Sequence, residues 1–185
     1  MIRVYPRKKL DYSFANILSA LTMTIVPRLD KSKIINEIEN LWPMENVIAG
    51  LSVRTIFDSL LTTKNFEKGS EVIMTGITIP DMVKIVESHG LKIVPIDLDM
   101  ETLQLKKEAL NKAISKKTVM IVVAHLFGSR MEMAPVYEAL DKRSDVLIIE
   151  DCAQAYNGIN GYTKQSKTDI STVSYTHLRA HETGY

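Results

Sequence analysis

Strand-like and helix-like segments alternate along the middle of this chain, and no other feature restricts its fold as strongly. Apolar runs typical of strands lie at residues 71–76, 91–99, 118–125 and 145–151. Amphipathic stretches typical of helices lie between them, at residues 79–90, 106–115 and 131–143. Because strands that alternate with helices form βαβ units, we predict an α/β fold with a mainly parallel sheet and helices on both faces.

The apolar runs also indicate where a ligand would bind. Runs such as "VMIVVA" and "VLII" are almost continuously apolar, which is typical of strands covered on both faces. In open parallel sheets of this kind, ligands bind at the carboxyl ends of the strands. The candidate site residues are therefore those that follow the four strands, namely Thr78, Asp97, His125 and Asp151.

The segments before this alternation predict a mostly helical N-terminal part. Apolar residues at three- and four-residue spacing predict helices over residues 11–21 and 30–42. Asp30 or Ser32 can cap the second of these helices. We expect a short strand at residues 46–51, where the α/β part begins.

A helix over residues 52–61 is expected next, with Ser52 as its N-terminal cap. Further along, two Asn-Gly pairs within residues 156–164 predict tight turns. We therefore divide the chain into an N-terminal helical segment, residues 1–45, and an α/β domain, residues 46–172.

Charge and cysteine content exclude several classes of function. The 185 residues include 23 basic and 22 acidic side chains, and this balance does not indicate nucleic acid or an anionic membrane as a partner. No apolar run reaches roughly 18 residues, and the basic N-terminus lacks the apolar core of a signal peptide. A single cysteine excludes an internal disulfide and is typical of a reducing compartment. We expect a cytoplasmic protein.

Asp151 ends the last apolar run, in the stretch "VLIIEDCAQA". One interpretation is a helix cap or a solvated acid in the loop after the strand. The other is a carboxylate that meets a ligand cation, because a buried ionised carboxylate is costly unless it is paired. A pyridinium N–H would be such a partner, and Gln154 could turn its amide toward the same ligand. His125 and Cys152 also have structural interpretations, as a core histidine and a small core residue.

Several stretches resemble, in the same order, the DegT/StrS family of pyridoxal-phosphate-dependent aminotransferases, many of which act on nucleotide sugars. "VLIIEDCAQA" is similar to the family's "VIEDAAQA", and "VVAHLFG" is similar to its "PVHLYG". Residues 69–99 and 159–171 resemble two further stretches of the family. The resemblance covers most of residues 47–171 and implies a large domain of the aspartate-aminotransferase type.

The resemblance also implies a role for each matching residue. Asp151 would pair with the pyridine nitrogen of pyridoxal 5'-phosphate, and Gln154 would hydrogen-bond its phenolic oxygen. His125 would lie near the ring, and the turn at Ser52 would place helix N–H groups on the phosphate. Ser174 would belong to the same cofactor site.

The chain departs from the family at two of these places. Val53 and Arg54 stand where the family usually has Gly-Thr. Val53 removes a flexible glycine, whereas Arg54 is either an ionic partner for the phosphate or a solvated helix residue. Ile79 replaces the aromatic residue that would stack on the ring, so stacking there would be aliphatic and the inference of a sugar substrate is weaker.

The end of the chain lacks the residue on which the family's chemistry depends. The resemblance places the Schiff-base lysine at Arg179, and a guanidinium stays protonated and cannot take that role. "VSYTHLRAHET" resembles the translation of a sequencing-library adapter, so we expect residues 173–185 to be non-native and the chain to be an inactive fragment. His177 and His181 have a metal-ligand spacing, but we expect no metal site in such a tail.

The resemblance implies that the parent protein moves an amino group from an amino acid to a carbonyl substrate, such as a nucleotide sugar, and that it is a homodimer. Two alternatives stay open. Relatives with histidine in place of the lysine are sugar dehydratases. In the other alternative, the chain is a non-catalytic domain that binds a phosphorylated ligand or a partner, and Arg179 is native. The residues themselves indicate neither the substrate nor the amino donor.

Overall fold

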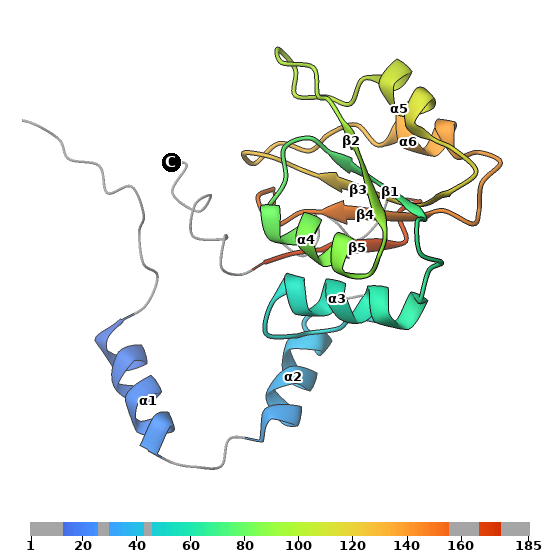
Figure 1. Cartoon of the computed structure of the whole chain (residues 1–185). Helices are drawn as coiled ribbons and strands as arrows, with labels where there is room; N and C mark the ends of the chain where they lie inside the picture. The colour runs from blue at the N-terminus through green and yellow to red at the C-terminus, as the bar shows by residue number, and fades with distance from the viewer. Residues whose placement is uncertain (1–12, 26–29, 43–45, 156–166, 175–185) are drawn as a thin grey trace, which may run out of the picture.

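A five-stranded parallel sheet forms the centre of the chain (Figure 1). The computed structural model describes residues 13–25, 30–42, 46–155 and 167–174. The strands are β1 (Glu71–Thr75), β2 (Lys92–Ile96), β3 (Thr118–Ala124), β4 (Leu147–Asp151) and β5 (Ile170–Thr172). They lie in the order β2-β1-β3-β4-β5, and every pairing between them is parallel. The predicted parallel sheet is thereby confirmed.

Helices cover both faces of this sheet, as the sequence predicts. The helices of the described residues are α1 (Phe14–Ile25), α2 (Lys31–Asn40), α3 (Val53–Lys64), α4 (Pro80–Ser88), α5 (Lys107–Ala113) and α6 (Ala134–Ala139). Helices α3 and α4 lie on one face, and α5 and α6 lie on the other (Figure 1). Because successive strand residues point to opposite faces, Ile73 packs in the core under α5 and α6, whereas Val72 and Met74 pack under α3 and α4.

The order of the strands creates a switch point between β1 and β3. From β1 the chain runs through α4 to β2 on one side, and then crosses through α5 to β3 on the other side of β1. In open α/β sheets, the connections on either side of such a point lead away from each other and leave a crevice at the carboxyl ends of the strands. The fold thus favours ligand binding beside the ends of β1 and β3.

Two short segments differ from the sequence-based prediction. The strand predicted at residues 46–51 is wrong: these residues pair with no strand in the described part of the chain, and Ile48 and Leu51 are exposed. Strand β5 was not predicted. Its three residues pair with Ile149, Glu150 and Asp151 of β4. Whether either segment forms a strand therefore depends on pairing with a neighbouring strand and not on local sequence alone.

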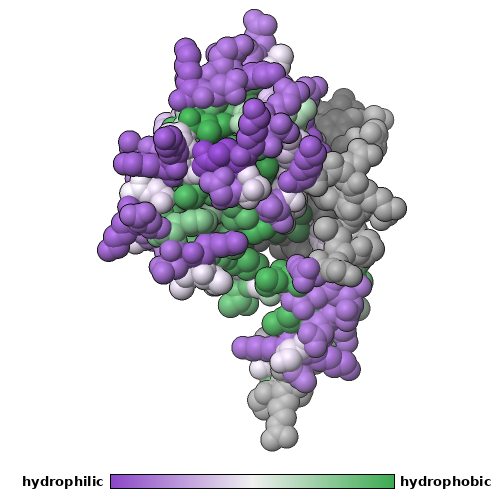
Figure 2. Space-filling model, turned by 90° about the vertical axis from the view of Figure 1, so that its right-hand side faces the viewer, coloured by the Kyte–Doolittle hydropathy of each residue, from purple (hydrophilic) through white to green (hydrophobic). Residues whose placement is uncertain are grey.

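The two N-terminal helices carry apolar side chains that the rest of the described chain does not cover. Neither α1 nor α2 has a buried residue, and Phe14 is 91% exposed. Figure 2 shows one face of the molecule, where apolar residues are exposed toward the lower, N-terminal part. Asp30 caps α2 by accepting hydrogen bonds from the N–H groups of Ser32 and Lys33. No described helix combines the length and the apolar character needed to cross a membrane.

Ser52 begins α3 as its cap, which confirms the sequence-based prediction. Its Oγ accepts the N–H of Thr55 at 3.1 Å. We expect Ser52→Ala to lower the free energy of unfolding by about 1 kcal/mol, because an N–H of the first turn then loses its acceptor. Ser52→Gly should cost only a few tenths of a kcal/mol, since glycine tolerates the cap conformation. Urea unfolding of the three chains measures both changes, and an unchanged stability of Ser52→Ala would contradict this role of the hydroxyl.

Candidate functional site

A hollow of about 250 Å³ opens at the carboxyl ends of β1, β3 and β4. Its polar lining comes from Thr78 after β1, His125 after β3, and Asp151 and Gln154 at the end of β4. Three of the four strand-end residues expected from the sequence therefore line the same hollow. The fourth, Asp97, is exposed and does not line it, because β2 is the edge strand of the sheet. The hollow thus lies at the switch point.

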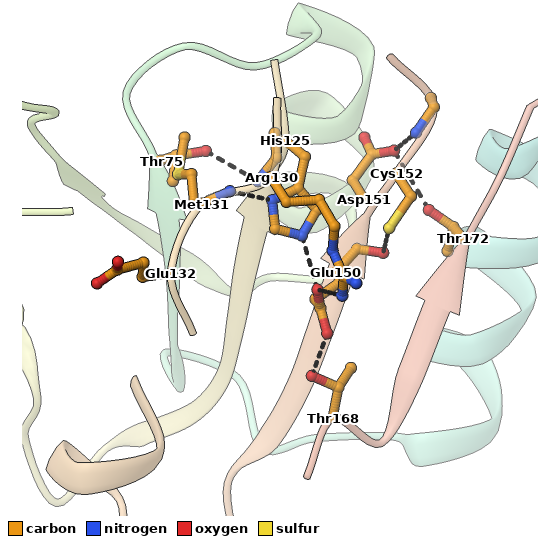
Figure 3. A network of polar contacts seen from close by, with 12 residues as sticks. Thr75, His125, Arg130, Met131, Glu132, Glu150, Asp151, Cys152, Thr168 and Thr172 are labelled. Carbon is orange, nitrogen blue, oxygen red and sulfur yellow. Dashed lines mark hydrogen bonds and ion pairs between the residues drawn. The ribbon is translucent and has the colours of Figure 1, made fainter. Parts of the chain in front are cut away.

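Asp151 is the buried carboxylate of this hollow, with 6% of its surface exposed. Its Oδ1 accepts hydrogen bonds from the Ala153 N–H at 3.1 Å and from the Thr172 hydroxyl at 3.3 Å (Figure 3). Its Oδ2 has no hydrogen-bond partner among the described residues. The interpretation as a solvated loop acid is therefore wrong. A buried carboxylate oxygen that lacks a partner and lines a hollow fits a cationic N–H donor of a ligand.

His125 lines the same hollow, but both of its ring nitrogens are bound within the protein. Nδ1 accepts the N–H of Met131 at 3.0 Å, so the ring proton is on Nε2. Nε2 lies 2.7 Å from Oε2 of Glu150 and donates to it (Figure 3). With both nitrogens engaged in this way and no exposed side-chain surface, the imidazole has no free nitrogen for proton transfer in the hollow.

Glu150, next to Asp151 in the chain, is fully buried and belongs to a separate polar network. Besides His125, its carboxylate accepts hydrogen bonds from Arg130 at 3.0 Å and from the Thr168 hydroxyl at 2.5 Å (Figure 3). Tyr137 of α6 in turn donates to Thr168 at 2.9 Å. Burial raises the pKa of Glu150, but the hydrogen bonds from His125, Thr168 and Arg130 outweigh it and lower the pKa to about 2.

Acid should destabilise the chain through Glu150. Because its pKa in the folded chain lies below the usual 4.5, the stability gained from its ionised form is complete above that value and is lost as the pH falls toward about 2. The full difference is about 3 kcal/mol. Urea unfolding between about pH 5 and pH 2 measures it.

Glu150→Gln is the matched variant for this measurement, because all other carboxylates are common to both chains. The difference in unfolding free energy between the wild-type chain and the variant should shrink as the pH falls. A difference that stays constant over this range would contradict the assignment of the acid sensitivity to Glu150.

Cys152 completes a group of three buried metal-ligand types, together with His125 and Glu150, whose candidate atoms lie within 4.8 Å of one another. Two of these residues are already engaged, His125 through both nitrogens and Glu150 through three donors. Burial raises the pKa of the Cys152 thiol far above its usual range, so the thiolate that a metal or an electrophile requires is strongly disfavoured. The group therefore acts as a hydrogen-bonded part of the core, and Cys152 is a core residue.

Two further residues expected at the site line the hollow. Gln154 does so, and its backbone carbonyl accepts the N–H of Gly128. Ile79 also lines the hollow, as an aliphatic residue at the place expected for it from the sequence. The hollow therefore combines a buried carboxylate, an amide and an aliphatic side chain.

The other expected residues lie away from the hollow or outside the described part of the chain. Ser52, Val53 and Arg54, at the start of α3, and Ser174, after β5, are not among the lining residues. Arg54 is about half exposed and pairs with Asp81 of α4 at 2.9 Å. Arg179 and the two histidines of the tail lie outside the described residues, as do the two Asn-Gly turns.

Two threonines of the site were not expected from the sequence. Thr172 binds Asp151, and Thr168 binds Glu150. The only signal for them was the pair of adjacent carboxylates at the end of a buried strand, since buried carboxylates require donors from neighbouring elements.

Fold and site together define an α/β domain with a hollow at its switch point, beside a buried aspartate. Residues 37–179 match the DegT/DnrJ/EryC1/StrS aminotransferase family, and the chain belongs to this family. The match ends at residue 179, which is an arginine in this chain.

Curated relatives and solved structures agree with this membership. The chain is 36% identical to the L-glutamine:2-deoxy-scyllo-inosose aminotransferase of Micromonospora echinospora over 88 residues. These aligned residues make up 48% of this chain and 21% of that protein. It is 31% identical to the GDP-perosamine synthase of Escherichia coli O157:H7 over 116 residues. These aligned residues make up 62% of this chain and 32% of that protein. The chain thus spans less than half the length of either relative.

Among solved structures, a GDP-4-keto-6-deoxymannose-3-dehydratase with a trapped PLP-glutamate geminal diamine has a similar fold. Its TM-score is 0.68 at 17% sequence identity, over 83% of this chain and 42% of that one. At this identity the likeness shows the fold alone, which is the large domain of a pyridoxal-phosphate enzyme of the aspartate-aminotransferase type.

Proposed function

We propose that this chain is part of an enzyme that uses pyridoxal 5'-phosphate to transfer an amino group from an amino acid to a carbonyl group of a sugar. The observation that carries the proposal is the buried carboxylate of Asp151, whose Oδ2 has no partner among the described residues and which lines the hollow at the switch point. The names of the relatives in Micromonospora and Escherichia coli support an amino-group transfer to a sugar or a cyclitol.

The residues around the hollow fit this cofactor. Asp151 would bind the protonated pyridine nitrogen, and Gln154, which lines the same hollow, would reach the phenolic oxygen. His125 and Ile79, which line the hollow, would lie near the ring. When bound, the cofactor supplies an electron sink for bonds at the α-carbon of the amino acid, and the carboxylate of Asp151 maintains the ring charge on which this depends.

The start of α3 would bind the phosphate. Ser52 caps a helix whose first N–H groups favour an anion, although Val53 replaces the glycine of the family pattern. Arg54 offers a cation that is now paired with Asp81 at 2.9 Å on the surface. A bound phosphate would compete with Asp81 for this guanidinium, because both are anions and Arg54 is half exposed.

Transfer of an amino group can be tested without knowing the sugar. The complete gene product is loaded with pyridoxal 5'-phosphate and mixed with L-glutamate or L-glutamine. Release of one 2-oxo acid per active site, together with conversion of the cofactor to its amine form, is expected. If neither amino acid nor any other common donor yields a 2-oxo acid, the proposed activity is wrong.

A sugar dehydratase of the same fold is the second candidate, favoured by the structural likeness to a dehydratase. The residue at position 179 separates the two, since the family places its lysine there and its dehydratases a histidine. Sequencing the source gene across codons 172–185 reads this residue directly. Lysine supports the aminotransferase, histidine supports the dehydratase, and a genomic arginine supports a domain that binds a phosphorylated ligand without catalysis.

We also propose that the complete protein is a cytoplasmic homodimer. The apolar side chains of α1, among them Phe14 and Leu18, are exposed in the single chain and would be covered by a second copy. Light scattering of the complete gene product after size-exclusion chromatography should give twice the mass of one chain. A monomer at micromolar concentration would contradict the dimer.

A further inference from the structure

The protein holds the carboxylate of Asp151 by only one of its two oxygens. Oδ1 accepts the N–H of Ala153 at 3.1 Å and the hydroxyl of Thr172 at 3.3 Å (Figure 3). Oδ2 accepts no hydrogen bond from the described residues. The contacts thus distinguish two oxygens that are equivalent in a free carboxylate, and they leave one oxygen for a ligand.

The main chain of Asp151 is fixed from both sides of β4. Its carbonyl accepts the N–H of His125, at the end of β3, at 2.9 Å. The next N–H, that of Cys152, donates to the carbonyl of Thr172 in β5 at 2.8 Å. Because both neighbouring strands hold the main chain, the freedom that remains to Asp151 is the rotation of its side chain.

The two donors to Oδ1 restrict this rotation to different extents. Ala153 lies two residues after Asp151, so the bond from its N–H is a local turn contact. The last torsion of an aspartate is broad and roughly two-fold, so either oxygen could make this contact after a turn of the carboxylate. Thr172 lies 21 residues further along the chain and donates from another strand. Its second bond fixes which oxygen the protein holds.

Strand β5 is short, but a side chain at its start sets its register on β4. The N–H of Asp169 donates to the carbonyl of Ile148 at 3.1 Å, and its Oδ2 accepts the N–H of Ile148 at 2.8 Å. In the resulting register, Thr172 pairs with Asp151. Side chains of paired residues point to the same face of a sheet, so the register brings the hydroxyl of Thr172 to the carboxylate.

We propose that Thr172 is a positioning residue of the cofactor site. Its hydroxyl holds Oδ1 of Asp151, so that Oδ2 is turned toward the hollow before a ligand binds. An acceptor that is already oriented strengthens binding, because its ordering costs no further entropy. The identity of the ligand rests on the proposed function, whereas the contact itself rests on the geometry of the chain.

Binding of pyridoxamine 5'-phosphate, which needs no lysine, tests this role by isothermal titration calorimetry. Thr172→Val keeps the branched shape but loses the hydroxyl, and it should weaken binding roughly threefold to tenfold, the value of one hydrogen bond. Thr172→Ser keeps the hydroxyl and should bind more tightly than Thr172→Val. Ser171→Ala removes an exposed hydroxyl from the neighbouring residue of β5 and should leave the affinity unchanged.

A merely structural role of Thr172 gives a different result when the carboxylate is absent. In an Asp151→Ala background, Thr172→Val should have almost no effect on affinity if the hydroxyl acts through the carboxylate. The same loss with and without the carboxylate would mean that Thr172 only supports β5, and it would overturn the proposal. Unchanged or tighter binding by Thr172→Val alone would also overturn it, because the hydroxyl would then not orient the carboxylate.

Urea unfolding of the same four chains tests the contact without any ligand. The effect of Thr172→Val on the equilibrium constant for unfolding should be roughly threefold or more larger in the wild-type background than in Asp151→Ala. Equal effects would overturn the proposal, because the hydroxyl would then not bind the carboxylate. If the effects differ as expected but the wild-type chain does not bind pyridoxamine 5'-phosphate, the cofactor and the role of Thr172 toward it are wrong, whereas the contact stands.

Discussion

Replacing Asp151 with asparagine is expected to weaken binding of pyridoxamine 5'-phosphate to the chain by about tenfold to 100-fold. The change keeps the size of the side chain but exchanges an ionised acceptor for a neutral one, and a hydrogen bond to a charged group contributes about 1.5–3 kcal/mol. Isothermal titration calorimetry at neutral pH measures the loss. The same variant should be at least as stable as the wild-type chain without ligand, because it removes a buried charge with only one hydrogen-bonded oxygen.

Asp97→Asn is the matched control for this experiment. Asp97 also follows a strand of the sheet, but it is exposed and outside the hollow. Its replacement removes the same charge from the chain and should leave the affinity unchanged. Equal losses in both variants would mean that Asp151 acts through net charge and does not bind the ring nitrogen, which would remove the observation that carries the proposed function.

Much of the architecture could be predicted from the sequence because the core strands are apolar enough to be identified locally. The runs that form β1, β3 and β4 are buried on both faces, and that burial shapes their composition. Strand β5 could not be found in the same way, because its three residues are only partly buried or exposed and depend on β4 for their hydrogen bonds. The strand prediction for residues 46–51, before α3, was wrong for the opposite reason. These residues are typical of a strand, but no described strand pairs with them.

The site was predictable in part for a similar reason. Asp151 and His125 lie at the ends of apolar strands. The topology of a parallel sheet therefore brings them to the same edge, independently of the contacts that their side chains make. The orientation of the His125 ring, by contrast, depends on Met131 and Glu150, and the ionisation of Glu150 depends on Thr168, which lies 18 residues further along the chain. Contacts between distant residues set these properties, and spacing along the sequence does not contain them.

Replacing Phe57 with alanine should lower the free energy of unfolding by about 3–5 kcal/mol, a large part of the stability of a small domain. Phe57 is 2% exposed and fills the space between α3 and the sheet, in one core with Leu61, Met74 and Met82. Its loss removes the buried ring surface and leaves a cavity that neighbouring helices close only in part. Urea unfolding followed by circular dichroism measures the change.

Phe14→Ala provides the comparison, because Phe14 is also a helical phenylalanine but is 91% exposed on α1. This variant should change the stability by less than about 0.5 kcal/mol. The contrast bears on function because Phe57 holds α3 against the sheet, and the start of α3 carries Ser52 and Arg54. If Phe57→Ala cost no more than Phe14→Ala, α3 would not be firmly docked. The proposed binding of the phosphate at its first turn would then lose its physical basis.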